Sequence, residues 1–217
     1  MSDTMLAIIG IIGGLMCAVG DLFLDLKGPE NKKLGDMKII DSMWEVMPHY
    51  RFVVSPILAM FAVPMYCGGV LALESLMASK APVYATVFKI IALIGAMGGF
   101  MIHTFLNLCP TIYQTIKKEA SFELAQKVIN RIFKQIYVPF FTLYIMLVVI
   151  PAVMIMYAII SGILAADLWC LCLNPIVFQI VGLLLRATKL KCFIDAPSCC
   201  AASLGLASYG VLALILL

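Results

Sequence analysis

The sequence predicts an all-α integral membrane protein, a bundle of six transmembrane helices whose N-terminus and C-terminus both lie outside. Of the 217 residues, 64% are hydrophobic and 12% are charged, whereas soluble domains have about 45–50% apolar and about 25% charged residues. The apolar residues form continuous runs, unlike the alternating segments of about ten residues in a membrane β-barrel. The basic residues gather in alternate connecting segments. This composition, with a mean hydropathy of +1.08, excludes soluble enzymes, nucleic-acid-binding proteins and disordered regulators.

Six apolar runs account for the predicted helices. A spanning helix needs about 20 apolar residues, because a rise of about 1.5 Å per residue must cross about 30 Å of hydrocarbon. The runs cover residues 5–26, 52–76, 83–107, 136–162, 169–187 and 200–217. The fifth and sixth are close to the shortest length that spans. Together they predict a single polytopic membrane domain over residues 1–217.

The first run is expected to stay in the protein as a helix. A cleavable signal peptide begins with basic residues and ends in a small-residue cleavage site. Here Asp3 precedes the run, and the run ends in Asp21 and Asp25. These acidic residues are not typical of a signal peptide.

The basic residues predict the orientation in the membrane. Thirteen of the 15 Lys and Arg residues follow the first, third and fifth runs. They are Lys27, Lys32, Lys33, Lys38, Arg51, Lys117, Lys118, Lys127, Arg131, Lys134, Arg186, Lys189 and Lys191. The other two, Lys80 and Lys89, lie toward the opposite side. Because loops rich in Lys and Arg stay in the cytoplasm, both termini are expected outside.

Two connecting segments carry structure of their own. The segment 28–50 is long for a helix–helix connection and contains Trp44, so it is expected at the cytoplasmic interface. In 121–135, apolar residues recur at helical spacing with basic residues between them. This pattern predicts either an amphipathic helix on the inner leaflet or a cytoplasmic extension of the fourth helix.

Polar residues within the apolar runs are the candidate functional residues, because an ionisable group in a spanning helix costs a few kcal/mol. Asp21 and Asp25 are four residues apart, which places both carboxylates on one helical face at the cytoplasmic end of the first helix. His103 and Asn107 have the same spacing at the cytoplasmic end of the third helix. Polar groups from separate helices therefore converge on one membrane half.

Three chemistries suit this cluster. A carboxylate beside a histidine can act as a general acid–base pair. The same oxygen and nitrogen atoms can hold a divalent cation, or relay protons in transport. Our hypothesis gives Asp21 and His103 the catalytic roles, with ligand binding by Asp25, Asn107, Arg51 and Gln179. The purely structural alternatives are an Asp21–His103 or Asp21–Arg51 pair, with Asp25 marking the end of the hydrocarbon.

Small residues predict how the cluster assembles. Three glycines on the first helix and three on the third permit close helix approach. They are Gly10, Gly13, Gly14, Gly95, Gly98 and Gly99. Direct packing of these two helices would bring Asp21 toward His103. At the outer ends, Glu74 and Lys89 are expected to form a structural pair.

No metal ligand set or cofactor is assigned from the sequence. The cytoplasmic cysteines Cys192, Cys199 and Cys200 lack the Cys-x-x-Cys spacing of a zinc site. Phosphate-binding loops, nucleophile elbows, His-Glu-x-x-His motifs and Rossmann glycine runs are absent as well. The cofactor is therefore left open.

A short N-terminal stretch carries a family resemblance. Residues 20–28 read GDLFLDLKG, and IDSMWE follows at 40–45 before Arg51. These segments resemble uncharacterised multi-pass membrane proteins of Gram-positive bacteria with a GDLxLDxKG segment and no known activity. The resemblance implies a bacterial plasma membrane and no particular reaction.

The function expected from these observations is an intramembrane, cytoplasm-facing polar pocket for a lipid-like or amphipathic small molecule. Membrane lipids are the expected partners, and nucleic acid is not. One alternative is a small proton- or cation-coupled transporter or channel acting as a homo-oligomer. A second alternative is a membrane interaction or assembly factor that works through the basic loops.

Overall fold

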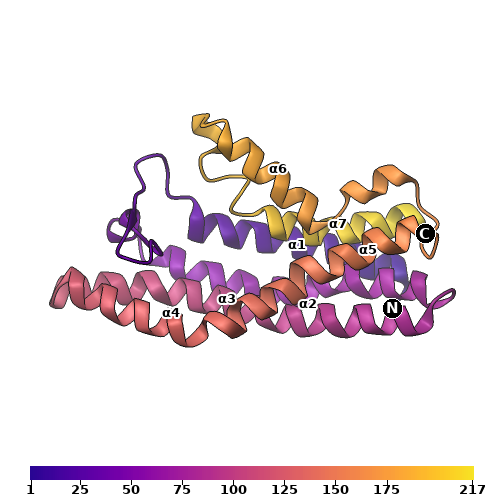
Figure 1. Ribbon diagram of the computed structural model, residues 1–217, viewed down its shortest axis with the longest axis horizontal. Helices are drawn as coiled ribbons and strands as arrows, with labels where there is room; N and C mark the ends of the chain where they lie inside the picture. The colour runs from indigo at the N-terminus through magenta and orange to yellow at the C-terminus, as the bar shows by residue number, and fades with distance from the viewer.

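The computed structural model describes residues 1–217 and is almost wholly helical (Figure 1). Its α-helices are α1 (Asp3–Asp25), α2 (Tyr50–Ala78), α3 (Pro82–Glu119), α4 (Phe122–Tyr144), α5 (Ile150–Ile160), α6 (Pro175–Ala187) and α7 (Ala201–Leu216). Short 3-10 turns lie at Ser42–Glu45, Leu168–Cys172 and Lys191–Phe193. The strands β1 (Lys33–Leu34) and β2 (Ile40–Asp41) pair antiparallel, with Lys33 opposite Asp41.

Four helical segments are long and apolar enough to span a membrane. They are α1, α2, α3 and the continuous helix Phe122–Ile160, which joins α4 to α5. Helices α6 and α7 have 13 and 16 residues. A straight membrane crossing needs about 20 residues, so both helices are shorter than that. The all-α membrane class is thus supported, while the six-span count stays a prediction.

The segment 121–135 is the start of a long helix and not a separate surface helix. The Ser121 side chain accepts a hydrogen bond from Leu124 N at 3.2 Å, which caps the first turn of α4. The helix then continues without a break through Tyr144. Of the two alternatives drawn from the sequence, the extension of the fourth helix is the one observed.

A π-helical segment, Ile145–Val149, separates α4 from α5. Ile150 N bonds to Ile145 O, a reach of five residues, immediately before Pro151. Since proline has no N–H to donate, the ladder must adjust near it, and π-bulges are one common adjustment. Leu147 and Val148 of this segment line the cavity described below.

The glycines of α1 and α3 do not pack against each other, so the predicted close packing of these two helices is wrong. A Cβ added to Gly14 would lie 2.5 Å from Ala207 N on α7, and Gly10 abuts Gly69 on α2. On α3, a Cβ at Gly95 would lie 2.5 Å from Leu147 N in the π segment. The glycines instead set α1 between α2 and α7, and α3 against the α4–α5 helix.

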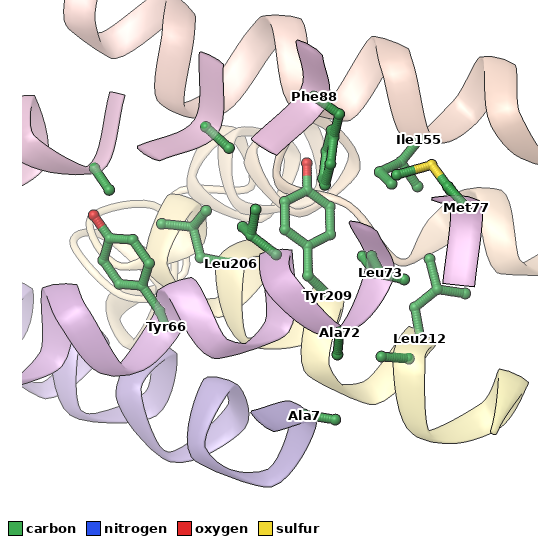
Figure 2. Close-up of a cluster of buried hydrophobic side chains, with 14 of the residues drawn as sticks. Ala7, Tyr66, Ala72, Leu73, Met77, Phe88, Ile155, Leu206, Tyr209 and Leu212 are labelled. Atoms are coloured by element: carbon green, nitrogen blue, oxygen red, sulfur yellow. The ribbon is translucent and has the colours of Figure 1, made fainter. Parts of the chain in front are cut away.

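The main core lies among α2, α3, α5 and α7 (Figure 2). Tyr209 points from α7 toward Phe88 on α3, with ring centroids 6.4 Å apart in an edge-on arrangement. Leu73 and Met77 of α2 are fully buried beside them. This packing closes the half of the bundle that holds both chain termini.

A second core lies at the opposite end, under the segment 26–49. Trp44 and Ile40 pack there with Tyr113 on α3 and Ile129 on α4. The Trp44 and Tyr113 rings meet edge-on at 6.1 Å. The long first connection is therefore a folded cap over the ends of α3 and α4.

Candidate functional site

A cavity of about 450 Å³ lies between the helices, and 14 of its 21 lining residues are hydrophobic. Its size and its mainly apolar wall are typical of small-molecule sites. Side chains with polar atoms reach it from six helices. They are Cys17, Asp21 and Asp25 on α1, Tyr66 on α2, His103 on α3, Tyr144 on α4, Gln179 on α6 and Ser203 on α7, with Ser198 and Cys199 just before α7.

The structure brings Asp21 and His103 together at the wall of this cavity. The distance from His103 Nε2 to Asp21 Oδ1 is 3.0 Å. The Ser203 hydroxyl donates to the other carboxylate oxygen at 2.6 Å. One carboxylate oxygen thus accepts a hydrogen bond from Ser203 and the other faces the imidazole nitrogen, so both have a polar partner, as a buried carboxylate requires.

Gly20, next to Asp21, lets α1 lie close to α2 beside the pair. A Cβ at Gly20 would lie 3.3 Å from Ser55 O on α2, a tight contact, and 4.0 Å from His103 Cε1, an ordinary one. The glycine therefore relieves crowding against the α2 backbone, and the imidazole lies at van der Waals distance from this position.

Cys17 lies one helical turn from Asp21 and shares its partner. The distance from Cys17 Sγ to His103 Nε2 is 3.5 Å. Since Nε2 carries at most one hydrogen, it can donate to only one of these two neighbours at a time. The other ring nitrogen, Nδ1, is buried and has no hydrogen-bond partner. The imidazole therefore has unused hydrogen-bonding capacity.

The same three side chains are the residues that could hold a metal ion. A sulfur, a carboxylate oxygen and an imidazole nitrogen from Cys17, Asp21 and His103 lie within 4.8 Å of one another. This donor set suits Zn²⁺ better than Mg²⁺ or Ca²⁺, which prefer oxygen alone. The sequence analysis assigned no metal ligands and did not select Cys17, although its i−4 spacing from Asp21 places it on the same face.

The cavity wall carries a second polar pair. The Gln179 side-chain amide donates to the Tyr144 hydroxyl, which joins α6 to α4 at the wall. The Tyr66 hydroxyl also reaches the wall, where it is buried and has no partner. Gln179 was predicted as a binding residue, and its position beside the cavity is compatible with that role.

Asp25 lines the cavity but is already paired. Lys27 Nζ lies 2.5 Å from Asp25 Oδ1 and 2.8 Å from Asp41 Oδ2. Burial disfavours the charged Lys27, yet the two carboxylates outweigh it and raise the pKa of Lys27. Burial likewise opposes ionisation of Asp41, but Lys27, Asn31 and Lys33 together lower the pKa of Asp41. This network ties the end of α1 to the hairpin.

The structure does not bring Asn107 and Arg51 to the cavity wall. Asn107 Nδ2 donates to Ser55 Oγ at 3.0 Å and to His103 O at 2.7 Å. Arg51 donates to the carbonyls of Phe23 and Leu26, both at 2.7 Å, where α1 ends. These contacts stabilise the helices that carry the site. Arg51 also forms no pair with Asp21, which removes that structural alternative.

The structure also places the Glu74–Lys89 pair, which was predicted, and Ser203, which was not. Glu74 and Lys89 form the expected pair, with Nζ and Oε1 2.6 Å apart. Ser203 was missed by the sequence analysis, because a serine 182 residues from Asp21 carries no local signal of their contact. Its role became visible only through the packing of α7 on α1.

Comparisons with known proteins give one match. The model of a family described as "Family of unknown function (DUF6796)" matches residues 1–217. No curated protein and no solved structure matches the sequence. The geometry of the site is therefore the evidence that bears on its chemistry.

Proposed function

The chain belongs to this family of unknown function, and we propose that it is a multi-pass membrane protein whose intramembrane pocket binds a lipid-like or amphipathic small molecule. One observation carries the proposal: the cavity has a mainly apolar wall with the Asp21–His103 pair at one side. Such a wall favours a ligand with an apolar body and a polar group.

The pair also supports a chemical role for the pocket. A histidine that donates from Nε2 to a carboxylate is held in one orientation and in one tautomer. In that arrangement His103 would exchange protons with a hydroxyl or carbonyl of the ligand, while Asp21 stabilises the charged ring. The pocket would then convert its ligand as well as bind it.

We further propose six membrane crossings, with both termini outside and the pocket open to the cytoplasmic half of a bacterial plasma membrane. The marked N- and C-terminal ends lie together at one end of the bundle (Figure 1), and the segment 26–49 lies at the other. That segment carries Lys27, Lys32, Lys33 and Lys38. Basic loops favour the cytoplasm. In this topology residues 161–187 form a broken fifth crossing, because only 175–187 are α-helical.

Native mass spectrometry of the protein, extracted in mild detergent and incubated with a total bacterial lipid extract, tests the binding proposal. We expect a lipid adduct on the wild type that is lost in Ala202→Phe, which fills the cavity, and reduced in Asp21→Asn. Glu74→Gln is the matched control, since it neutralises a helix carboxylate outside the cavity. Bare wild-type protein, or equal adducts in all variants, would overturn the proposal.

A transporter is the second candidate, favoured by the break before α6. Asn174 is 1% exposed and caps α6 by accepting from Ile176 N at 3.0 Å. Discontinuous helices that begin inside the membrane commonly form transport sites. Proton or cation flux in proteoliposomes that is lost in Asp21→Asn but kept in Glu74→Gln would favour this candidate.

A further inference from the structure

A second, smaller cavity adjoins the first, and we propose that it holds an anionic, phosphate-like headgroup of the ligand. This inference rests on the proposed function, whose ligand class it narrows. The second cavity measures about 220 Å³ and shares Leu24, Asp25 and Leu106 with the first. The shared wall makes the two cavities neighbouring parts of one site. Both walls are mainly apolar, but the second also carries three lysines and two aspartates.

The charges of the second cavity leave one cation without a partner. Lys27, Lys33 and Lys38 line it together with Asp25 and Asp41. Lys27 contacts both carboxylates, and Lys33 Nζ lies 2.9 Å from Asp41 Oδ1. Lys38 makes no ion pair. Its ammonium group is therefore free to bind an anion, while the two carboxylates are already neutralised.

A buried donor without a partner is the second observation. Trp44 lines the same cavity, is 6% exposed, and its Nε1 has no hydrogen-bond partner. An indole N–H can only donate, and leaving a buried donor unpaired is unfavourable. An acceptor that reached the indole nitrogen from the cavity would satisfy it. Phosphate oxygens are strong acceptors that also attract the Lys38 ammonium.

The hairpin positions Lys38 for this role. Its backbone has φ of 55°, which is uncommon for a residue with a long side chain. Lys38 N bonds to Gly35 O at 3.3 Å, which closes the turn between β1 and β2. Because the turn leads into β2, whose two residues Ile40 and Asp41 are buried, the turn holds Lys38 beside the cavity.

A set of lipid titrations followed by native mass spectrometry tests the inference. The probes are dihexanoyl phosphatidic acid, dihexanoylglycerol and inorganic phosphate, added to detergent-solubilised full-length protein. Lys38→Asn removes the charge with a residue that tolerates positive φ, Lys38→Arg keeps the charge, and Trp44→Phe removes the donor. Lys32→Ala is the matched control, since Lys32 lies on the same loop, is exposed and does not line the cavity.

We expect Lys38→Asn and Trp44→Phe each to weaken phosphatidic acid binding about tenfold, the loss of one charge-assisted or buried hydrogen bond. Dihexanoylglycerol binding should not change, and Lys38→Arg and Lys32→Ala should bind like the wild type. Inorganic phosphate that displaces phosphatidic acid would indicate that the subsite takes free phosphate. A lack of displacement would assign the subsite to a lipid headgroup.

The inference is wrong if the wild type binds both lipids equally, or if Lys38→Asn and Trp44→Phe keep full phosphatidic acid binding. Ala202→Phe separates this failure from that of the proposed function. Loss of both lipids in Ala202→Phe with no effect of Lys38→Asn would keep the pocket and remove the headgroup subsite. Unchanged binding of both lipids in Ala202→Phe would overturn the proposed function itself.

Discussion

The two halves of the bundle differ in how closely the helices approach. In the glycine-packed half, around Gly10, Gly69 and Gly210, glycines leave no room for a Cβ between the backbones of α1, α2 and α7. In the cavity half, around Asp21 and His103, the helices separate and polar side chains meet across the gap. Close backbone contact maximises dispersion, whereas separation creates a site. The glycine-packed half can thus fix the positions of the helices that surround the cavity.

The largest expected effect breaks the glycine-packed half. Gly10→Leu places a side chain against the Gly69 backbone, which cannot move aside as a flexible side chain would. Overpacking typically costs about 1–3 kcal/mol, and more where backbone must shift. We expect loss of monodisperse protein in fluorescence-detected size-exclusion chromatography. Val19→Leu, an enlargement at an exposed position of α1, should behave like the wild type. A well-folded Gly10→Leu would show that close approach is dispensable.

The next effect tests the cavity half. His103→Ala leaves the Asp21 carboxylate buried with Ser203 as its remaining partner. Breaking a buried pair by removing one member costs about 3–5 kcal/mol. The apparent Tm should fall clearly, and Asp21→Asn in the same chain should restore much of it, because the lone charge is gone. A double variant no more stable than His103→Ala would argue against the buried ion pair.

A smaller effect comes from Ser203. Ser203→Ala removes one hydrogen bond to Asp21 and should cost about 1–2 kcal/mol. Because the serine lines the cavity, the same change should also weaken lipid adducts in native mass spectrometry. Ser208→Ala is the matched control, since Ser208 bonds only to Gly205 O in its own helix. Equal effects of the two changes would reduce Ser203 to a packing role.

The hairpin beside the cavity should respond to pH. The pKa of Asp41 is lowered in the folded protein. Its carboxylate therefore stabilises the hairpin fully above the unfolded pKa of about 3.9, and this stabilisation is lost as pH falls below that value. The pKa of Lys27 is raised in the folded protein. Its ammonium group therefore stabilises the hairpin fully below the unfolded pKa of about 10.4, and this stabilisation is lost at higher pH. The protection factors of the amides in residues 33–41, which correct for the intrinsic pH dependence of hydrogen exchange, should therefore fall at both extremes. In Asp41→Asn the acid response should disappear, and its persistence would contradict this assignment.

The smallest effect is expected for the Glu74–Lys89 pair in the half that lacks the cavity. Lys89 is about one-third exposed, and such pairs contribute about 0–1 kcal/mol. Glu74→Gln should shift the apparent Tm little and leave lipid binding unchanged. A large loss of binding would mean that the two halves are coupled.

Local patterns anticipated much of this fold. The runs at 5–26 and 52–76 match α1 and α2 within two residues at all four ends, because continuous hydrophobicity is a property of the run itself. The fifth run was less well predicted, since 169–173 is apolar but not α-helical. Pro175 cannot continue a preceding helix, and Asn174 caps a new one.

By itself, the sequence determined the membrane class, the basic loops, and the shared faces of Asp21 with Asp25 and His103 with Asn107. These follow from composition and from helical periodicity, which are local. Only the tertiary structure decided that Ser203 and Cys17 join Asp21 and His103, that Arg51 closes α1, and that Lys27 pairs with Asp41. Such contacts depend on which helix lies beside which, and the glycine contacts between helices settle that choice.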